Sequence, residues 1–139
     1  MLKLAGISNN IEECEKLILQ NIQNGKALEK FIELVENQGG DIEYIKDTNK
    51  FEKAKYIMPV TADKDFKISE INAGKIGNLC VELGAGRIKK EDNIDYSAGI
   101  VLNKKVGEKV KKNDILAYVH SNNEEKCKNT VDEMKKIIK

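Results

Sequence analysis

The sequence of 139 residues predicts an α+β fold: an N-terminal helical pair, then a small mixed β-sheet with one inserted helix, then a C-terminal helix. Two observations predict this class. Apolar residues recur at helical spacing between residues 11 and 35, whereas short strand-like runs begin only after residue 55. Hydrophobic residues make up 40% of the chain and charged residues 34%, which is typical of a globular protein.

Two short helices are expected at the front of the chain. The first begins after Asn10, a residue type that caps helices, with Glu13 placed as in a capping box, and it ends at Asn24-Gly25. The second carries one apolar stripe and stops at Gln38-Gly39-Gly40-Asp41. Its stripe consists of Leu28, Phe31, Ile32 and Val35. An isolated pair of this size buries one face poorly, so we expect it to need a neighbour.

The chain changes character between residues 41 and 56, where we expect irregular structure with one helical turn near Ile42. Strands are predicted at 56–61, 66–71, 99–104 and 115–120, with Leu102 and Ile115 in the core. Pro59 lacks an N–H, so the first strand should lie at an edge or contain a bulge.

Two further helices are predicted in the second part of the chain. Asn72 caps a helix over 73–83 that Gly84 closes, and Asn123 starts the last helix. The last helix has an apolar stripe at four- and three-residue spacing, made of Cys127, Val131, Met134 and Ile138.

Cysteine and histidine usage argues against a disulfide framework, a zinc site and a nucleophilic triad. The cysteines are Cys14, Cys80 and Cys127, an odd number without a CxxC pair, and each lies on an apolar helical stripe as a small buried hydrophobe would. His120 is the only imidazole, and its neighbour Ser121 should point to the opposite face of the strand. We therefore predict no catalytic, cofactor-binding or metal-binding residue in this chain.

Charge and length also exclude several classes of function. The chain has 24 basic and 23 acidic residues, and Arg87 is its one arginine, which argues against nucleic acid or an anionic membrane as partner. No apolar run approaches the length of a membrane span or of a secretory signal peptide, so we expect a cytoplasmic protein.

The glycine cluster Leu83-Gly84-Ala85-Gly86-Arg87 follows a predicted helix, whereas phosphate cradles precede one. We expect these glycines to permit a sharp reversal with positive φ and close packing. The alternative is contact with a ligand or another domain, for which Arg87, Lys89 and Lys90 are the candidates. Asp92 and Asp95 are expected to cap a turn or helix.

Residues 99–119 combine a strand, two bends at Gly107-Glu108 and Asn113-Asp114, and a second strand. This segment resembles half of a lipoyl- or biotin-carrier sandwich. Carriers present their modified lysine on a hairpin tip, but the equivalent stretch here, 120–123, contains none. The nearest lysine, Lys126, falls within a predicted helix.

Several strings together resemble the C-terminal part of pyrimidine-nucleoside phosphorylases, the family that includes thymidine phosphorylase. They are Phe31 with Val35-Glu36-Asn37-Gln38-Gly39-Gly40-Asp41, Gly84-Ala85-Gly86-Arg87, Ile94-Asp95 with Gly99, and the bends from Gly107 to Leu116. The resemblance covers nearly the whole chain and is strongest between residues 31 and 120.

The resemblance implies that residues 1–55 are a helical segment from the end of the parent α/β domain and that 56–139 form an α/β-hammerhead (barrel-sandwich-like) domain. The family reaction is phosphorolysis of a pyrimidine nucleoside to the base and a pentose 1-phosphate, a pentosyl transfer with phosphate as co-substrate. In that family, the sites that bind phosphate, the pyrimidine base and a monovalent cation lie in the domains that precede this segment. The homodimer contact is made mostly by the family's helical domain, which also precedes it.

The resemblance therefore implies a structural domain that is inactive alone and whose partners are the N-terminal domains of the parent. Two alternatives remain: a non-catalytic binding or interaction module acting through Arg87, Lys89 and Lys90, or a carrier-like domain without its acceptor lysine.

Overall fold

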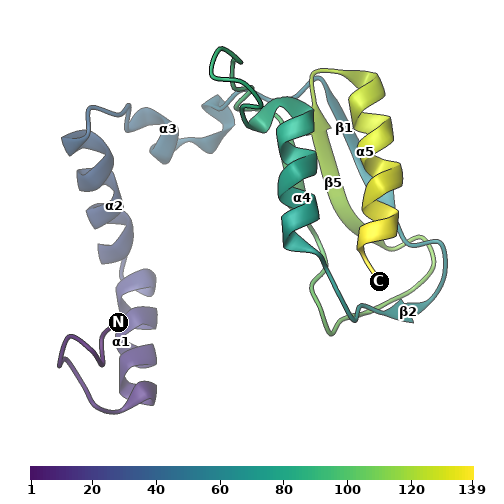
Figure 1. The fold of residues 1–139 in the computed structure, drawn as a ribbon. Coiled ribbons are helices and arrows are strands. Elements are labelled where there is room, and N and C mark those ends of the chain that lie inside the picture. Colours follow the sequence, from purple (N-terminus) through teal and green to yellow (C-terminus); the bar gives the residue numbers. More distant parts are fainter. The chain divides into compact units, whose positions relative to one another are not determined.

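The structure, a computed structural model, describes residues 1–139 as two compact units, Met1–Lys50 and Phe51–Lys139. The first unit is helical, and the second combines helices with two small sheets (Figure 1). The predicted α+β class is confirmed. None of the helices is long and apolar enough to cross a lipid bilayer.

The first unit contains α1 (Ile11–Gln23), α2 (Lys26–Asn37), α3 (Glu43–Lys46) and the 3-10 turn η1 (Thr48–Lys50). Both predicted helices are confirmed, and Asn10 caps α1 by accepting hydrogen bonds from the N–H groups of Glu12 (2.8 Å) and Glu13 (3.4 Å). The Glu13 carboxylate accepts from the Ser8 hydroxyl at 2.7 Å, so the cap works through Asn10 and Ser8. Local side-chain hydrogen bonds thus define where this helix begins.

The apolar stripes of this unit are largely exposed to solvent. Cys14 is its one buried residue, and α2 contains none. The exposed apolar side chains of α1 and α2 are Ile11, Leu17, Ile18, Leu19, Ile22, Leu28, Phe31 and Leu34. The pair therefore forms helices without forming a core of its own.

The second unit contains a three-stranded sheet of order β1-β5-β3, formed by Tyr56–Thr61, Ile115–Ser121 and Gly99–Leu102. A two-stranded sheet joins β2 (Phe66–Lys67) to β4 (Lys109–Val110). Every strand pair is antiparallel, which corrects the predicted mixed sheet. Pro59 lies on the edge strand β1, and the register shifts between Val60 and Thr61, as its missing N–H predicts.

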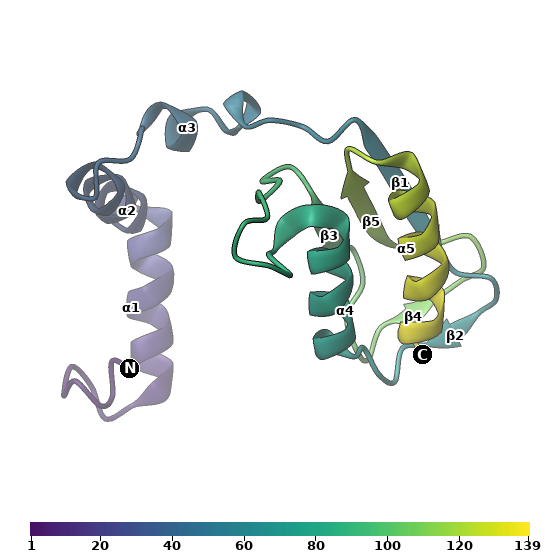
Figure 2. The ribbon, with the colours of Figure 1, turned by 45° about the horizontal axis from the view of Figure 1, so that its top comes forward.

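Two helices lie side by side over one face of the three-stranded sheet (Figures 1 and 2). They are α4 (Ala73–Cys80), which continues as the π-helical turn η2 (Val81–Ala85), and α5 (Glu124–Ile137). Asn72 and Asn123 cap them by accepting from the N–H groups three residues on, as predicted. The resulting sheet-and-helix pair of layers encloses the core of this unit.

The core of the second unit joins residues that are distant in the sequence. Its fully buried members include Val60, Val119, Cys127 and Met134, from β1, β5 and α5. The whole buried set is Val60, Ala62, Ile68, Leu79, Leu83, Val110, Leu116, Ala117, Val119, Cys127, Met134, Ile137 and Ile138. Burial of this apolar surface is the main term that stabilises the unit.

Three sequence-based predictions in this unit are wrong in detail. Leu102 is 41% exposed and Ile115 is only half-buried, although both were expected in the core. Leu102 ends β3, an edge strand with no neighbour on one side. The strand predicted at 66–71 extends only over Phe66–Lys67, and Ile71 forms an isolated bridge with Ile138, because β4 is short.

Candidate functional site

The glycine cluster forms a tight reversal after α4, as predicted, and its two glycines act differently. Gly84 has φ of +113° and its carbonyl accepts from the Asp95 N–H at 2.9 Å. Gly86 has φ of −145°, and a Cβ there would lie 2.8 Å from Cγ2 of Val81. The positive φ therefore explains why glycine occupies position 84, whereas close packing against Val81 explains the glycine at position 86.

Two carboxylates organise the loop that leaves this reversal. The Asp92 carboxylate accepts from the N–H groups of Ile88 (3.0 Å) and Lys89 (2.8 Å), which caps a turn as predicted. The Asp95 carboxylate accepts from the N–H (3.0 Å) and hydroxyl (2.6 Å) of Ser97. Both acids are therefore occupied in holding backbone.

Asp95 also ties the loop to the three-stranded sheet. Its second oxygen accepts from the Asn122 side-chain amide at 2.9 Å, and the Asn122 oxygen accepts from the Lys55 N–H at 2.8 Å. The hydrogen bond from the Ser97 hydroxyl is the largest of the effects that hold the pKa of Asp95 below its usual value. The loop base is thus fixed next to the start of β1 and the end of β5.

The candidates Arg87, Lys89 and Lys90 all lie on this loop, and all three are exposed. None of their side chains forms a salt bridge within the chain. The three residues lie within four positions of one another, and their exposed side chains are available to an external partner.

His120 and Ser121 do not form a nucleophilic pair. His120 lies within β5, half-buried, opposite Ile57 on one side and Gly99 on the other. Ser121 is fully buried, and its hydroxyl oxygen accepts from the Asn123 N–H at 3.1 Å. Because adjacent strand residues point to opposite faces, His120 cannot activate Ser121.

The cysteines are all free thiols. Cys14 and Cys127 are buried and Cys80 is partly buried, in agreement with a packing role. The Cys127 thiol donates to the Val119 carbonyl at 3.4 Å, and burial raises the pKa of Cys80 and of Cys127. A raised pKa lowers the thiolate fraction, so these two thiols are poor nucleophiles. No three His, Cys, Asp or Glu side chains gather as metal ligands would.

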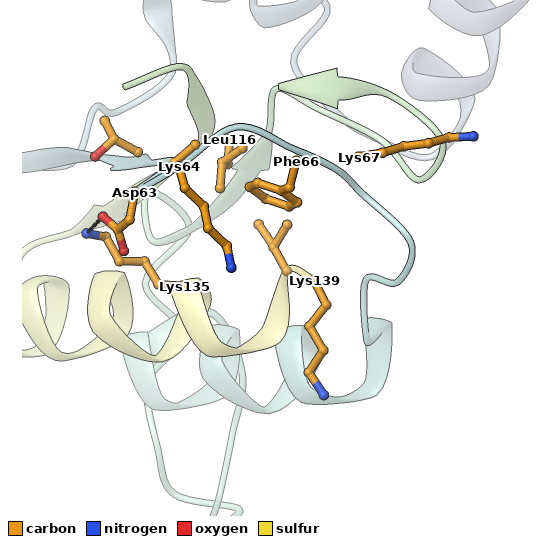
Figure 3. Close-up of a pocket in the computed structure, with 10 residues that line it drawn as sticks. Asp63, Lys64, Phe66, Lys67, Leu116, Lys135 and Lys139 are labelled. Carbon is orange, nitrogen blue, oxygen red and sulfur yellow. Dashed lines mark hydrogen bonds and ion pairs between the residues drawn. The ribbon is translucent and has the colours of Figure 1, made fainter. Parts of the chain in front are cut away.

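A pocket of about 420 Å³ lies where the β1–β2 connection meets the end of α5 (Figure 3). Phe66, Leu116 and Ile138 supply its apolar surface. Its lysines are Lys64, Lys67, Lys135 and Lys139. Lys135 forms an ion pair with Asp63 at 2.9 Å.

The lysines of this pocket do not converge on one point. The side chains of Lys67 and Lys139 point away from its centre (Figure 3). The nearby N–H groups of Ser69 and Glu70 already donate to the Lys139 carbonyl, at 2.6 and 3.0 Å. Sequence reasoning missed this pocket because its residues span positions 61 to 139 without any characteristic spacing.

Comparison with known proteins adds a family to this geometry. A family model described as the pyrimidine nucleoside phosphorylase C-terminal domain matches residues 67–139. The chain is 44% identical over 137 residues to the pyrimidine-nucleoside phosphorylase of Staphylococcus haemolyticus. It is 43% and 40% identical over 125 residues to the proteins of that name from Staphylococcus epidermidis and Staphylococcus aureus.

These matches cover the chain almost completely but the relatives only in part. The S. haemolyticus match includes 99% of this chain and 31% of that protein. The matches to the S. epidermidis and S. aureus proteins include 90% of this chain and 29% of each relative. The chain therefore spans less than a third of the length of the relatives it matches.

Proposed function

Because this chain belongs to the pyrimidine-nucleoside phosphorylase family and corresponds to its C-terminal domain, we propose that it is a structural part of a longer phosphorylase and is inactive alone. The parent reaction is the phosphorolysis of a pyrimidine nucleoside to the free base and a pentose 1-phosphate. The parent is a pentosyltransferase, and this chain helps to form and stiffen the body that closes over its substrate.

The observation that carries this proposal is the asymmetry of the match, 99% of this chain against 31% of the S. haemolyticus protein. Phosphorolysis must stabilise an oxocarbenium-like sugar and a phosphate dianion, which requires convergent cations and oriented N–H donors. Arg87 is exposed on a loop, and the pocket lysines diverge. The reacting groups therefore belong to the rest of the polypeptide.

The exposed apolar stripes of α1 and α2 support the proposal that this helical pair packs against another domain of the parent enzyme. In this proposal residues 1–55 are the last part of the parent α/β domain, and 56–139 are a hammerhead-like domain. The preceding domains would cover α2, in which no residue is buried. Burying its apolar stripe there would supply the core that the pair lacks.

The basic loop belongs to the same proposal. Arg87, Lys89 and Lys90 form no salt bridge within the chain, so they are free to contact a ligand or another domain of the parent. The remaining properties are those of the family. The parent is a cytoplasmic homodimer joined through its helical domain, holds its monovalent cation outside this segment, and binds neither nucleic acid nor membrane.

The carrier-like alternative is less favoured. Lys126 lies in the first turn of α5, and its N–H donates to the capping Asn123 oxygen at 3.0 Å. A lysine held in a helix cannot protrude from a hairpin tip as a carrier lysine does. An unchanged intact mass after co-expression with lipoate or biotin ligase is the expected result.

The experiment uses the isolated chain and a chimera in which it replaces the matched 31% of the S. haemolyticus enzyme. Release of free base from thymidine or uridine with phosphate is measured. We expect no turnover from the chain, and chimera turnover within about tenfold of the S. haemolyticus enzyme, a difference of about 1.4 kcal/mol. The S. haemolyticus enzyme truncated at the same position is the control and should be inactive.

Turnover by the isolated chain at rates typical of enzymes would contradict the proposal. So would a chimera that folds but releases no base, since the chain would then fail as a C-terminal domain.

A further inference from the structure

The three-stranded sheet has a second face, on the side away from α4 and α5. Residues directly opposite each other in an antiparallel pair point to the same face. Ile57 lies opposite His120, while Tyr118 lies between Pro59 and Val101. We call these five residues, Ile57, Pro59, Val101, Tyr118 and His120, the open face.

The alternate residues of the same strands point toward the helices, and all of them except Leu102 at the end of β3 are buried or partly buried. They include Val60, Val119 and Ile100. In contrast, Val101 of the open face is 56% exposed, and a Cβ built on Gly99, next to His120, would meet nothing within 4 Å. Both helices lie on the other side of the sheet (Figures 1 and 2), so the unit Phe51–Lys139 does not cover this face itself.

The composition of the open face is unusual for a surface that remains in water. Antiparallel sheets with one solvated face normally place polar residues outward. Charged residues make up 34% of this chain, yet none of the five positions carries Lys, Arg, Asp or Glu. Three are aliphatic or proline, and Tyr and His combine an apolar body with a polar group, as is common at interfaces.

We propose that the open face is the surface of this domain that packs against the preceding part of the polypeptide in a full-length phosphorylase. The inference rests on the proposed function. The relatives have about two thirds of their length outside the matched segment, which is enough chain to cover the face. The surface that meets it is apolar at its centre and offers hydrogen-bond acceptors near the Tyr118 hydroxyl and the His120 ring.

The first test measures burial directly and does not depend on activity. Hydroxyl-radical footprinting compares Tyr118 and His120 in the isolated chain with the same residues in the chimera. Both side chains are half-buried in the isolated chain. We expect about tenfold slower oxidation in the chimera, where reaction would first require the docked surface to open at a cost of about 1.4 kcal/mol. Equal oxidation of the two residues in the two proteins would overturn the proposal, whether or not the chimera is active.

The second test uses a pair of matched valines. Val101→Lys places a charge on the open face, and Val106→Lys places one at a residue of nearly equal exposure, 57%, in the turn between β3 and β4. In the isolated chain both variants should melt at the wild-type temperature. In the chimera only Val101→Lys should lower the melting temperature and slow base release.

Identical behaviour of the two variants in the chimera would overturn the proposal. A second copy of the chain is the competing occupant. If the isolated chain sediments as a dimer that Val101→Lys converts to a monomer, the face is a contact between copies and the proposal is wrong. An inactive chimera with a protected Tyr118 would instead reject the proposed function and retain this inference.

Discussion

The two units of this chain have similar helices but very different cores. In Met1–Lys50, two amphipathic helices leave eight apolar side chains exposed and bury one residue, Cys14. In Phe51–Lys139, α5 is only one residue longer than α1, yet it buries Cys127, Thr130, Met134 and Ile137. The difference lies in the partners, because α5 packs on β1 and β5 whereas α1 meets chiefly α2.

This difference shows that helix formation and helix burial have separate causes. Capping side chains and apolar spacing fix where a helix begins and ends. Tertiary stability comes from the surface against which the apolar face packs. The first unit has the apolar pattern of two amphipathic helices but buries only Cys14, so it lacks such a surface among its own residues.

The largest expected effect is the loss of a core side chain in the second unit. Met134→Ala removes a fully buried side chain and should lower the free energy of unfolding of that unit by about 2–5 kcal/mol. Phe31→Ala removes a side chain that is 46% exposed on α2, so its effect in the isolated chain should stay below about 1 kcal/mol. Amide hydrogen exchange measured by mass spectrometry follows both units in one sample. A larger loss for Phe31→Ala would contradict the contrast between the units.

The next effect concerns the glycines of the reversal. Gly84→Ala forces a non-glycine residue to φ of +113° and should cost about 1–3 kcal/mol. Gly86→Ala should cost less, because its φ is ordinary and only Val81 must move. Gly77→Ala, within α4 and with open space at its Cβ, is the control and should stabilise by about 0.5–1 kcal/mol. Urea titration measures the free energy of unfolding of each variant. No change for Gly84→Ala would contradict the positive φ assigned to this residue.

Equivalent helix caps should have unequal effects in the two units. Asn123→Ala removes the cap of α5 and should reduce the global stability of the second unit by about 1 kcal/mol. Asn10→Ala removes the same kind of cap from α1 but should only increase fraying there, because little of α1 is buried. Exchange rates at the first turn of each helix measure the difference. Equal decreases in the global melting temperature for Asn10→Ala and Asn123→Ala would contradict the claim that α1 contributes little to a buried core.

The smallest effect is a pH dependence of the second unit's stability that comes from Asp95. Hydrogen bonds, first that from Ser97, lower the pKa of Asp95 in the folded state. Its contribution to stability is therefore present above the ordinary aspartate pKa and is lost as pH falls through the lowered value. Asp95→Asn should destabilise at pH 7 by more than at a pH below the lowered pKa of Asp95, where the wild-type carboxyl is also uncharged. A difference that does not change between these pH values would rule out this role.

The sequence predicts the helices of this fold well because their signals are local. Asn10, Asn72 and Asn123 each cap the helix that follows, and each lies within three residues of the N–H it satisfies. Pro59 is likewise a local signal, because its missing N–H by itself predicts an edge strand or a bulge. These features depend on nearby atoms, so a pattern in the chain is enough to find them.

Features that depend on distant partners were not predictable in the same way. The strand at Phe66–Lys67 ends early because its partner is the two-residue strand Lys109–Val110. Leu102 was expected inside, but it ends an edge strand. The lysine-lined pocket joins residues up to 78 positions apart, from Thr61 to Lys139, and the open face joins three strands. Only tertiary structure brings such residues together.

The distribution of the thiols has a practical consequence for this protein. Cys14 lies in the first unit, while Cys80 and Cys127 lie in the second, and none is engaged in a disulfide. An alkylating reagent can modify a buried thiol only when the surrounding structure opens. Cys14 and Cys127 are both buried, so the order in which these two thiols acquire the reagent's mass would record which of the two units opens first.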